Sequence, residues 1–138
     1  MTTIRKAIED RIRETVTGLC SVAGSADLDA VTAGRVNPPA AYVFEAASKG
    51  ASQEIDGQQQ VNESFAVVIV VSNKRGERGV DSADQCRGLR GQIFQALVGW
   101  EPGLTHDAMM YDSGRLVLLK DGLLYWQDFY KTTGVWPG

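Results

Sequence analysis

The stretch Val61-Asn-Glu-Ser-Phe65-Ala-Val-Val-Ile-Val-Val71-Ser72 carries an apolar run rich in β-branched residues. The run is too short to cross a bilayer, and polar, turn-prone sequence bounds it on both sides. An exposed face would require a polar residue at every second position, so the run predicts a strand buried on both faces. Burying one aliphatic side chain stabilises a fold by roughly 1.5–3 kcal/mol. We therefore expect this strand to anchor the structure.

Length and composition predict one α+β domain spanning residues 1–138. The net charge of −3 argues against a general nucleic-acid binder, whose footprint would be a basic face. It is compatible with a surface that DNA passes without sticking. No window resembles a membrane helix of about 20 apolar residues, and the N-terminus lacks the apolar core of a signal peptide. We expect no membrane partner.

The two cysteines, Cys20 and Cys86, lie far apart in the sequence, with no CxxC motif and no histidine at metal-ligand spacing. In a chain without secretion signals this pattern favours two buried, reduced thiols over a disulfide bridge.

One amphipathic helix is expected before the central strand, over residues 3–17, where apolar residues recur at helical spacing and charged residues fill the other side. Residues 21–37 predict a loop with a short helical turn near residues 26–31. Residues 41–46 predict a strand. Residues 49–59 are polar, contain two glycines and show no period, which predicts a long, mobile hairpin connection.

A second helix is expected after the central strand. Ser82 and Gln85 have capping-box spacing and predict a helix that begins there and extends to about residue 98. Gly88 and Gly91 each cost roughly 1 kcal/mol in a helix interior. Their presence has two readings: another backbone, such as that of a neighbouring subunit, approaches this helix closely, or the helix simply tolerates them.

The segment between the central strand and the second helix is charged and punctuated by glycine. Its charged residues are Lys74, Arg75, Glu77 and Arg78. One reading is a loop that contacts a partner, and the other is a solvated loop. The sequence does not continue as a phosphate-binding loop, because no Gly-Lys-Ser/Thr follows.

The remainder predicts a β-meander of three strands with a turn at residues 112–114 and a tight hairpin turn at Asp121-Gly122. The strands are expected near residues 108–111, 116–119 and 123–130. Both faces of the last strand are apolar, so one face packs on the helices and the other lacks cover in a chain of this size. We expect a neighbouring subunit to bury it, with Trp126 and Tyr130 as candidate inter-subunit contacts.

A search for catalytic chemistry gives no candidates. His106 is the only histidine, so a histidine-based metal cluster is excluded and a triad would depend on that one residue. It fits a polar strand entry better. No serine lies in a nucleophile-elbow pattern, and no local carboxylate pair suggests acid–base catalysis. We predict no catalytic residue, no cofactor and no metal site, and therefore no enzyme.

Several stretches resemble the tail terminator (tail completion) proteins of long-tailed bacteriophages. The most specific of them places Gly99, Trp100 and Pro102 directly after the second helix. The matching stretches are Ile4-Arg-Lys-Ala-Ile-Glu-Asp-Arg-Ile12, Pro39-Ala-Ala-Tyr-Val43, Gln60-Val61 leading into Phe65–Val71, Ala96-Leu97-Val98-Gly99-Trp100-Glu101-Pro102, and the aromatic C-terminal part with Tyr125 and Phe129.

The resemblance implies a fold with the element order α-β-β-α-β-β-β, in which two main helices pack on one face of a mostly antiparallel sheet. It also implies a structural virion protein, assembled in the host cytoplasm, that forms a ring, expected to be a hexamer. Such a ring caps the tail tube, ends its polymerisation and joins it to the head. Its expected partners are sister subunits, the tail tube protein and a head–tail connector or neck protein, with DNA passing through without sequence-specific binding.

Two other functions stay open at this point. The chain resembles in size and composition the head-completion proteins of the same neck, which would bind the portal or adaptor ring instead of the tube. A small α+β ligand-binding domain or enzyme, with a pocket between helices and sheet, is the alternative from another class.

Overall fold

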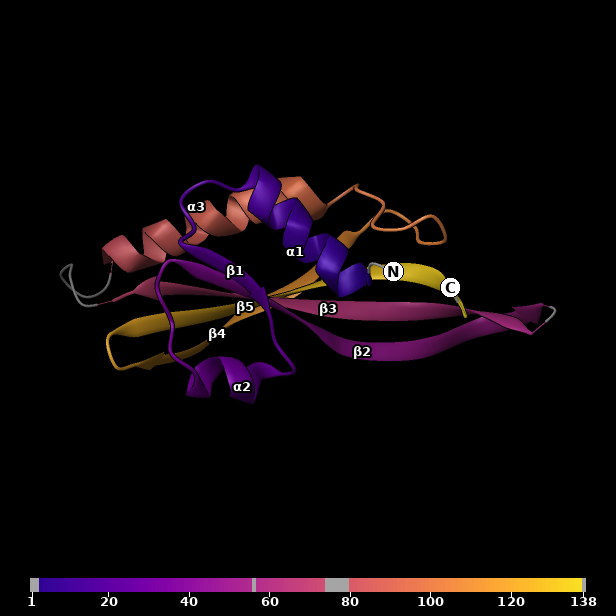
Figure 1. Ribbon diagram of the computed structural model, residues 1–138, viewed down its shortest axis with the longest axis horizontal. Helices are drawn as coiled ribbons and strands as arrows, with labels where there is room; N and C mark the ends of the chain where they lie inside the picture. Colours follow the sequence, from indigo (N-terminus) through magenta and orange to yellow (C-terminus); the bar gives the residue numbers. More distant parts are fainter. Residues whose placement is uncertain (1–2, 56, 74–79, 138) are drawn as a thin grey trace.

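A single five-stranded sheet with helices on both faces forms the molecule, in a computed structural model that describes residues 3–55, 57–73 and 80–137 (Figure 1). The strand order is β1-β2-β3-β5-β4. The elements follow in chain order as α1 (Ile4–Thr15), β1 (Ser21–Gly24), α2 (Leu28–Ala33), β2 (Ala40–Ile55), β3 (Gln58–Ser72), α3 (Val80–Leu97), β4 (Met110–Lys120) and β5 (Leu123–Trp136).

The predicted α+β class with a mostly antiparallel sheet is confirmed. Only β1 runs parallel to its neighbour, and the other three strand pairs are antiparallel. The predicted order α-β-β-α-β-β-β is wrong in two places. The segment between the first helix and the second strand contains both β1 and α2, and the three expected C-terminal strands are two.

Strand β3 is the centre of the fold, as its apolar run predicts. On one face, Phe65, Val67 and Ile69 join the core cluster beneath α1 and α3. On the other face, Val68 and Val70 join a second cluster. Each of these five side chains is at most 1% exposed. The alternation of a strand sends neighbouring residues to opposite faces, so one unbroken apolar run supplies two cores.

Helices α1 and α3 pack on the same face of the sheet (Figure 1), as predicted. Thr3 caps α1, because its hydroxyl oxygen accepts a hydrogen bond from the backbone N–H of Lys6. The capping role predicted for Ser82 is wrong, since α3 already begins at Val80. The Ser82 hydroxyl is buried and donates instead to the side-chain oxygen of Asn73, at 2.5 Å.

The opposite face of the sheet is covered by α2, which corrects the expectation that this face lacks cover. Asp27 caps α2 by accepting a hydrogen bond from the backbone N–H of Ala30 at 2.9 Å. Val31 of α2 is 3% exposed and packs with Phe44 and Tyr125 over the sheet. The large hydrophobic residues that stay exposed are Phe94, Leu104, Met110, Leu116, Leu119 and Trp136.

The polar segment 49–59 is a hairpin, as predicted, but its arms are paired strands where a long connection was expected. β2 continues to Ile55 and β3 starts at Gln58, with Lys49 opposite Asn62 in the antiparallel register. Figure 1 shows this hairpin extending well beyond the helices. The described side chains at residues 45–50 and 57–60 are exposed, so they need no apolar period, and backbone pairing makes the strands.

The turn predicted at residues 112–114 is also wrong. β4 runs through it as one strand, and a register shift between Tyr111 and Ser113 absorbs the extra residue. The turn at Asp121 and Gly122 is confirmed, with φ of 53° and 76°, the positive values that a tight hairpin turn requires.

Both cysteines are free thiols, but only one is buried. Cys86 lies in the core under α3, whereas Cys20 is exposed in the connection between α1 and β1. The prediction of two buried thiols holds for Cys86 and is wrong for Cys20.

Candidate protein interaction surfaces

The helix surface that carries Gly88 and Gly91 is exposed and flat. A Cβ atom built on either glycine meets nothing within 4 Å. Within the described part of the chain, then, no backbone approaches α3 at these positions. Of the two readings of these glycines, close approach inside the chain is excluded, while approach by a second subunit stays a prediction.

Next to Gly91 lies a buried ion pair that joins α3 to β5. The Asp128 carboxylate is 1% exposed. The Arg90 guanidinium donates to both of its oxygens, from Nε at 2.9 Å and from Nη2 at 3.1 Å. The Trp126 indole N–H donates to the same carboxylate at 2.9 Å, and the Tyr111 hydroxyl does so at 3.1 Å. This bidentate, charge-assisted contact between Arg90 and Asp128 fixes the orientation of α3 on the sheet.

The aromatic ring of Trp126 completes this cluster. The Arg90 guanidinium carbon lies 4.2 Å from its ring centroid, a cation–π contact. Gly114 on β4 faces the cluster, and a Cβ there would lie 2.0 Å from the Asp128 carboxylate and 2.5 Å from the Tyr111 hydroxyl. Only glycine lets β4 approach so closely.

Burial and the Asp128 carboxylate shift the pKa values of Arg90 and Tyr111. Burial raises the pKa of Tyr111, and the neighbouring Asp128 carboxylate raises it further. Burial alone would lower the pKa of Arg90, but its hydrogen bonds to Asp128 outweigh that effect and the pKa is raised. Arg90 therefore stays charged and Tyr111 stays neutral, the states that the cluster needs.

Tyr130 corrects a prediction. Its side chain is 1% exposed, and its ring packs edge-on against Tyr111 at 5.5 Å between centroids. Burial strongly raises the pKa of its hydroxyl. A side chain that its own chain encloses to this degree offers a partner almost no surface, so Tyr130 supports the candidate interface from beneath. Trp126 is only partly buried and keeps some exposed surface.

These residues line a groove between α3 and the edge strand β4, called here the α3–β4 groove. Its volume is about 280 Å³. Phe94 forms one wall and is 43% exposed. Its lining residues are Arg87, Arg90, Gly91, Phe94, Tyr111, Asp128 and Tyr130.

Two exposed leucines on β4 extend the groove along its outer side. Leu116 lies opposite Trp126 in the register, and Leu119 lies opposite Leu124. Directly paired residues share a face of the sheet, and both partners pack with the core beneath the helices. Leu116 and Leu119 thus point to the helix side, beyond the reach of α3, where they are 48% and 57% exposed.

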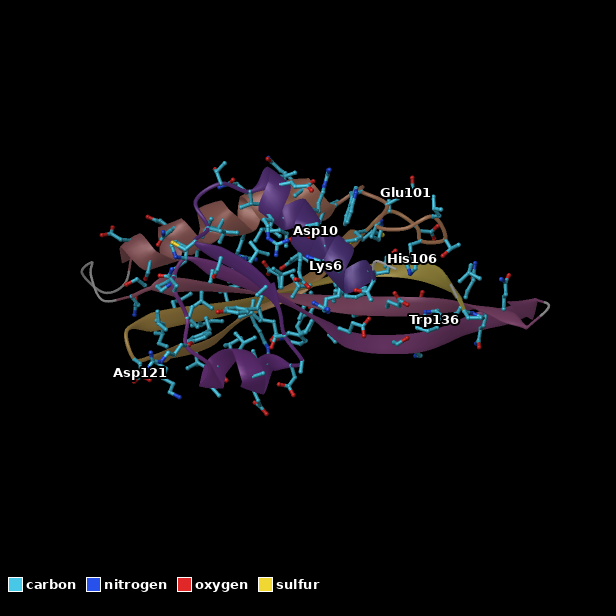
Figure 2. The ribbon with its side chains drawn as sticks, in the orientation of Figure 1. Lys6, Asp10, Glu101, His106, Asp121 and Trp136 are labelled. Carbon is cyan, nitrogen blue, oxygen red and sulfur yellow. The ribbon has the colours of Figure 1, made fainter. Side chains whose placement is uncertain are left out.

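A second apolar surface lies in residues 101–107, called here the Leu104 loop. Leu104 is fully exposed, at 107% of its reference surface, and Trp136 next to the loop is 50% exposed. They border a cavity of about 530 Å³ that is lined mainly by apolar surface, including Ile4 and Val135. Figure 2 shows Glu101, His106 and Trp136 gathered at this end, beside the start of α1.

His106 anchors this loop. It is 8% exposed, and its Nε2 lies 3.2 Å from the Glu63 carboxylate of β3. The Trp136 indole N–H donates to the other oxygen of the same carboxylate. The structural role predicted for His106 agrees with this geometry, because the side chain ties a loop to the sheet and faces no nucleophile.

Gly99, Trp100 and Pro102 form the turn that leads from α3 into this loop. Gly99 has φ of 84°, and its N–H donates to the carbonyl of Met109 at 2.9 Å. The Met109 N–H returns a bond to the Trp100 carbonyl at 2.9 Å, and Pro102 is buried. The Arg11 guanidinium carbon lies 5.4 Å from the centroid of the Trp100 ring. This motif therefore shapes the backbone where α3 leads into the loop.

The remaining predicted contact residues, Lys74, Arg75, Glu77 and Arg78, lie outside the described residues. In the described part of the chain, no three His, Cys, Asp or Glu side chains are grouped so that they could hold a metal ion. None of the described helices has the length and apolarity needed to span a membrane.

Sequence reasoning missed three residues that define these surfaces. Asp128 gave a usable signal, since it is the lone carboxylate of a strand rich in apolar and aromatic residues, and such a group needs a partner if it is buried. Leu104 and Phe94 gave none, because an apolar residue in a loop or on a helix looks the same in sequence whether it is buried or exposed.

Two of three comparisons with known proteins give a match. The family model described as "Phage tail terminator protein" matches residues 4–137. A solved structure titled "Virion of native gene transfer agent (GTA) particle" contains a similar chain, with a TM-score of 0.59 at 10% identity. The alignment covers 95% of this chain and 93% of that one. At this identity the likeness establishes the fold. A comparison with curated protein sequences gives no match.

Proposed function

Because the chain belongs to the phage tail terminator family, we propose that it forms a hexameric ring that caps the tail tube, ends tube polymerisation and joins the tail to the neck. The family assignment makes it a structural protein of the virion tail. The observation that carries the finer proposal is the match over residues 4–137, which leaves no described segment outside the family pattern.

The distribution of apolar surface supports assembly. A free domain of this size has little reason to keep several large apolar side chains exposed at its rim while it seals both faces of its sheet. The exposed rim residues on the helix side are Phe94, Leu116 and Leu119. A ring of sister subunits would cover them.

The β2–β3 hairpin and the segment 74–79 are proposed to contact the tail tube and the neck. The hairpin projects from the body of the domain (Figure 1), which gives it reach without disturbing the core. Lys74, Arg75, Glu77 and Arg78 supply charges for such contacts. Contacts made by polar hairpins and loops of this kind favour specificity and reversibility over strength.

DNA is proposed to pass through the ring without specific binding. Compact-domain scaling gives a radius of gyration of roughly 14 Å for this length, so six copies would leave a hole of roughly 30 Å. A subunit with net charge −3 would repel phosphate rather than hold it. Assembly would take place in the host cytoplasm.

The test is to mix the purified chain with purified tail tube protein and follow tube length by electron microscopy. We expect added chain to stop elongation and to appear as a ring at tube ends, because a cap removes the growing surface. Tubes that grow to the same lengths with and without it would overturn the proposal.

Fractionation separates this function from its alternative within the neck. A tail terminator co-purifies with isolated tails that lack heads. A head-completion protein would co-purify with isolated capsids instead and would leave tube ends bare.

A further inference from the structure

The Leu104 loop is an ordered segment that presents a leucine to solvent. Its backbone is held to β5 by two hydrogen bonds, from Asp107 N–H to Thr133 O at 2.9 Å and from Val135 N–H to Thr105 O at 3.2 Å. Leu104 itself stays fully exposed. A loop ordered before binding loses little conformational entropy when it docks, so it is suited to enter a partner's groove.

The α3–β4 groove has the complementary form. Gly91 leaves its helical wall flat, with open space where a side chain would stand. Phe94 lines the groove on α3, and Leu116 offers exposed apolar surface on β4. Arg90 of α3 and Tyr111 of β4 both hydrogen-bond to Asp128 of β5, so one carboxylate holds the two walls together in the free chain.

The charges beside the two surfaces are opposite. Glu101 and Asp107 are exposed on the Leu104 loop, and Arg87 is exposed at the mouth of the groove. Within residues 3–55, 57–73 and 80–137, no ion pair involves any of these three charges. Opposite, uncompensated charges around two apolar surfaces steer those surfaces toward each other.

We infer that the Leu104 loop of one copy docks in the α3–β4 groove of the next copy, with Glu101 and Asp107 facing Arg87. This inference rests on the proposed ring. Because loop and groove are different parts of the same chain, the contact is head-to-tail, and an open oligomer keeps a free loop at one end and a free groove at the other until a ring closes. Gly88 and Gly91 are then the place where the neighbour's backbone approaches α3.

A cysteine pair tests the contact directly. In a Cys20→Ser background, Leu104→Cys and Gly91→Cys are placed in one chain and oxidised in the presence of tail tubes. We expect a ladder of disulfide-linked species on a denaturing gel up to the full ring. The matched control replaces Gly91→Cys with Asp29→Cys on the exposed surface of α2, and it should stay monomeric.

A mixture of two blocked chains tests the head-to-tail geometry. The first carries Leu104→Asp with Gly91→Cys, so its loop is blocked and its groove is open. The second carries Gly91→Trp with Leu104→Cys, so its groove is blocked and its loop is free. Alone, neither should assemble on tubes. Mixed and oxidised in the Cys20→Ser background, they should give one linked dimer and nothing larger.

All substituted positions are exposed, so no variant should unfold at a lower midpoint than the wild type, which separates lost assembly from lost folding. The Gly91 variants should unfold at a slightly higher midpoint, because they remove a glycine from the interior of α3. Rings formed by the Leu104→Asp chain, or an unlinked cysteine pair in a wild-type-like ring on a tube, would overturn the loop-in-groove contact alone. A wild-type chain that never associates on tubes would overturn the proposed function with it.

Discussion

Strands β3 and β4 belong to the same sheet but have opposite surroundings. In β3, every residue from Phe65 to Val71 is at most 1% exposed, and its two faces supply two cores. In β4, no residue is buried, and Leu116 and Leu119 are about half exposed. Stability is thus concentrated at the centre of the sheet, while apolar surface available to partners is concentrated at its edge.

The open edge of β4 is also protected against pairing with a strand of another molecule. β4 contains two register shifts, and it carries the exposed cations Arg115 and Lys120. Irregular spacing and charge discourage another strand from adding to an open edge. We conclude that β4 contributes side chains to an interface more readily than backbone hydrogen bonds.

The largest expected loss of stability comes from truncating one buried side chain in each of the two core clusters. Ile69→Ala should cost about 2–5 kcal/mol of unfolding free energy on the helix side, and Phe44→Ala about 3–5 kcal/mol on the α2 side. Leu119→Ala on β4 should stay within about 0.5 kcal/mol. Urea unfolding measures all three. A loss below about 1 kcal/mol for Phe44→Ala would mean that α2 does not seal its face.

The next effect concerns the ion pair that holds α3 over β5. Asp128→Ala removes the shared acceptor and should cost about 3 kcal/mol, at the low end for a broken buried ion pair because Arg90 keeps 21% of its side chain in solvent. Asp112→Ala, which removes an exposed carboxylate 3.8 Å from Lys131, is the matched control and should change stability by less than about 1 kcal/mol. If Asp128→Ala and Asp112→Ala lowered the unfolding free energy equally, the ion pair of Asp128 would not be what holds α3 on β5.

A pair of glycine substitutions sharpens the comparison further. Gly114→Ala places a methyl group against the Asp128 carboxylate and should cost about 1–3 kcal/mol by overpacking. The methyl group added by Gly88→Ala lies in open space. Because alanine favours the helix more than glycine does, this substitution should stabilise the free chain by about 1 kcal/mol. Thermal unfolding reports both, and the sign for Gly88→Ala is the decisive observation.

The smallest expected effect concerns the reactivity of the two cysteine thiols. Burial raises the pKa of the Cys86 thiol from 9.0 to about 11, whereas Cys20 is exposed. At pH 8 a thiol reagent should label one cysteine quickly in the folded chain and two in urea. Because the folded pKa lies above the unfolded value, the protonated Cys86 favours folding. That contribution is complete below pH 9 and disappears as the pH rises to 11. Rapid double labelling of the folded chain would contradict the burial.

The sequence predicted the elements whose residues carry a strong period. The run from Phe65 to Val71 predicted a doubly buried strand, and the amphipathic spacing over residues 3–17 predicted α1. The hairpin over residues 49–59 was predicted, but its strand structure was missed, because strands held by backbone pairing in solvent need no hydrophobic alternation. The extension of β4 through residues 112–114 was misread for a related reason, since a bulge and a turn use the same small polar residues.

The interaction surfaces were predictable only in part. Gly88 and Gly91 suggested a close approach to the helix because glycine inside a helix carries a cost, and approach by a second subunit stays a prediction. The cover that α2 gives to the second face was missed, since six residues leave a weak signal, and the expectation of an open sheet face failed with it. Leu104 and Phe94 acquire meaning only when their exposure in the fold is known.

The central claim is that copies of this chain associate through their rims into a closed ring on the end of a tail tube. The most direct measurement is the stoichiometry and symmetry of the chain at tube ends, determined by electron microscopy of capped tubes. We predict six copies related by a sixfold axis, with the α3–β4 groove of each copy covered by its neighbour. Single copies scattered on the tube, or a ring in which Phe94 and Leu116 remain in solvent, would contradict the account.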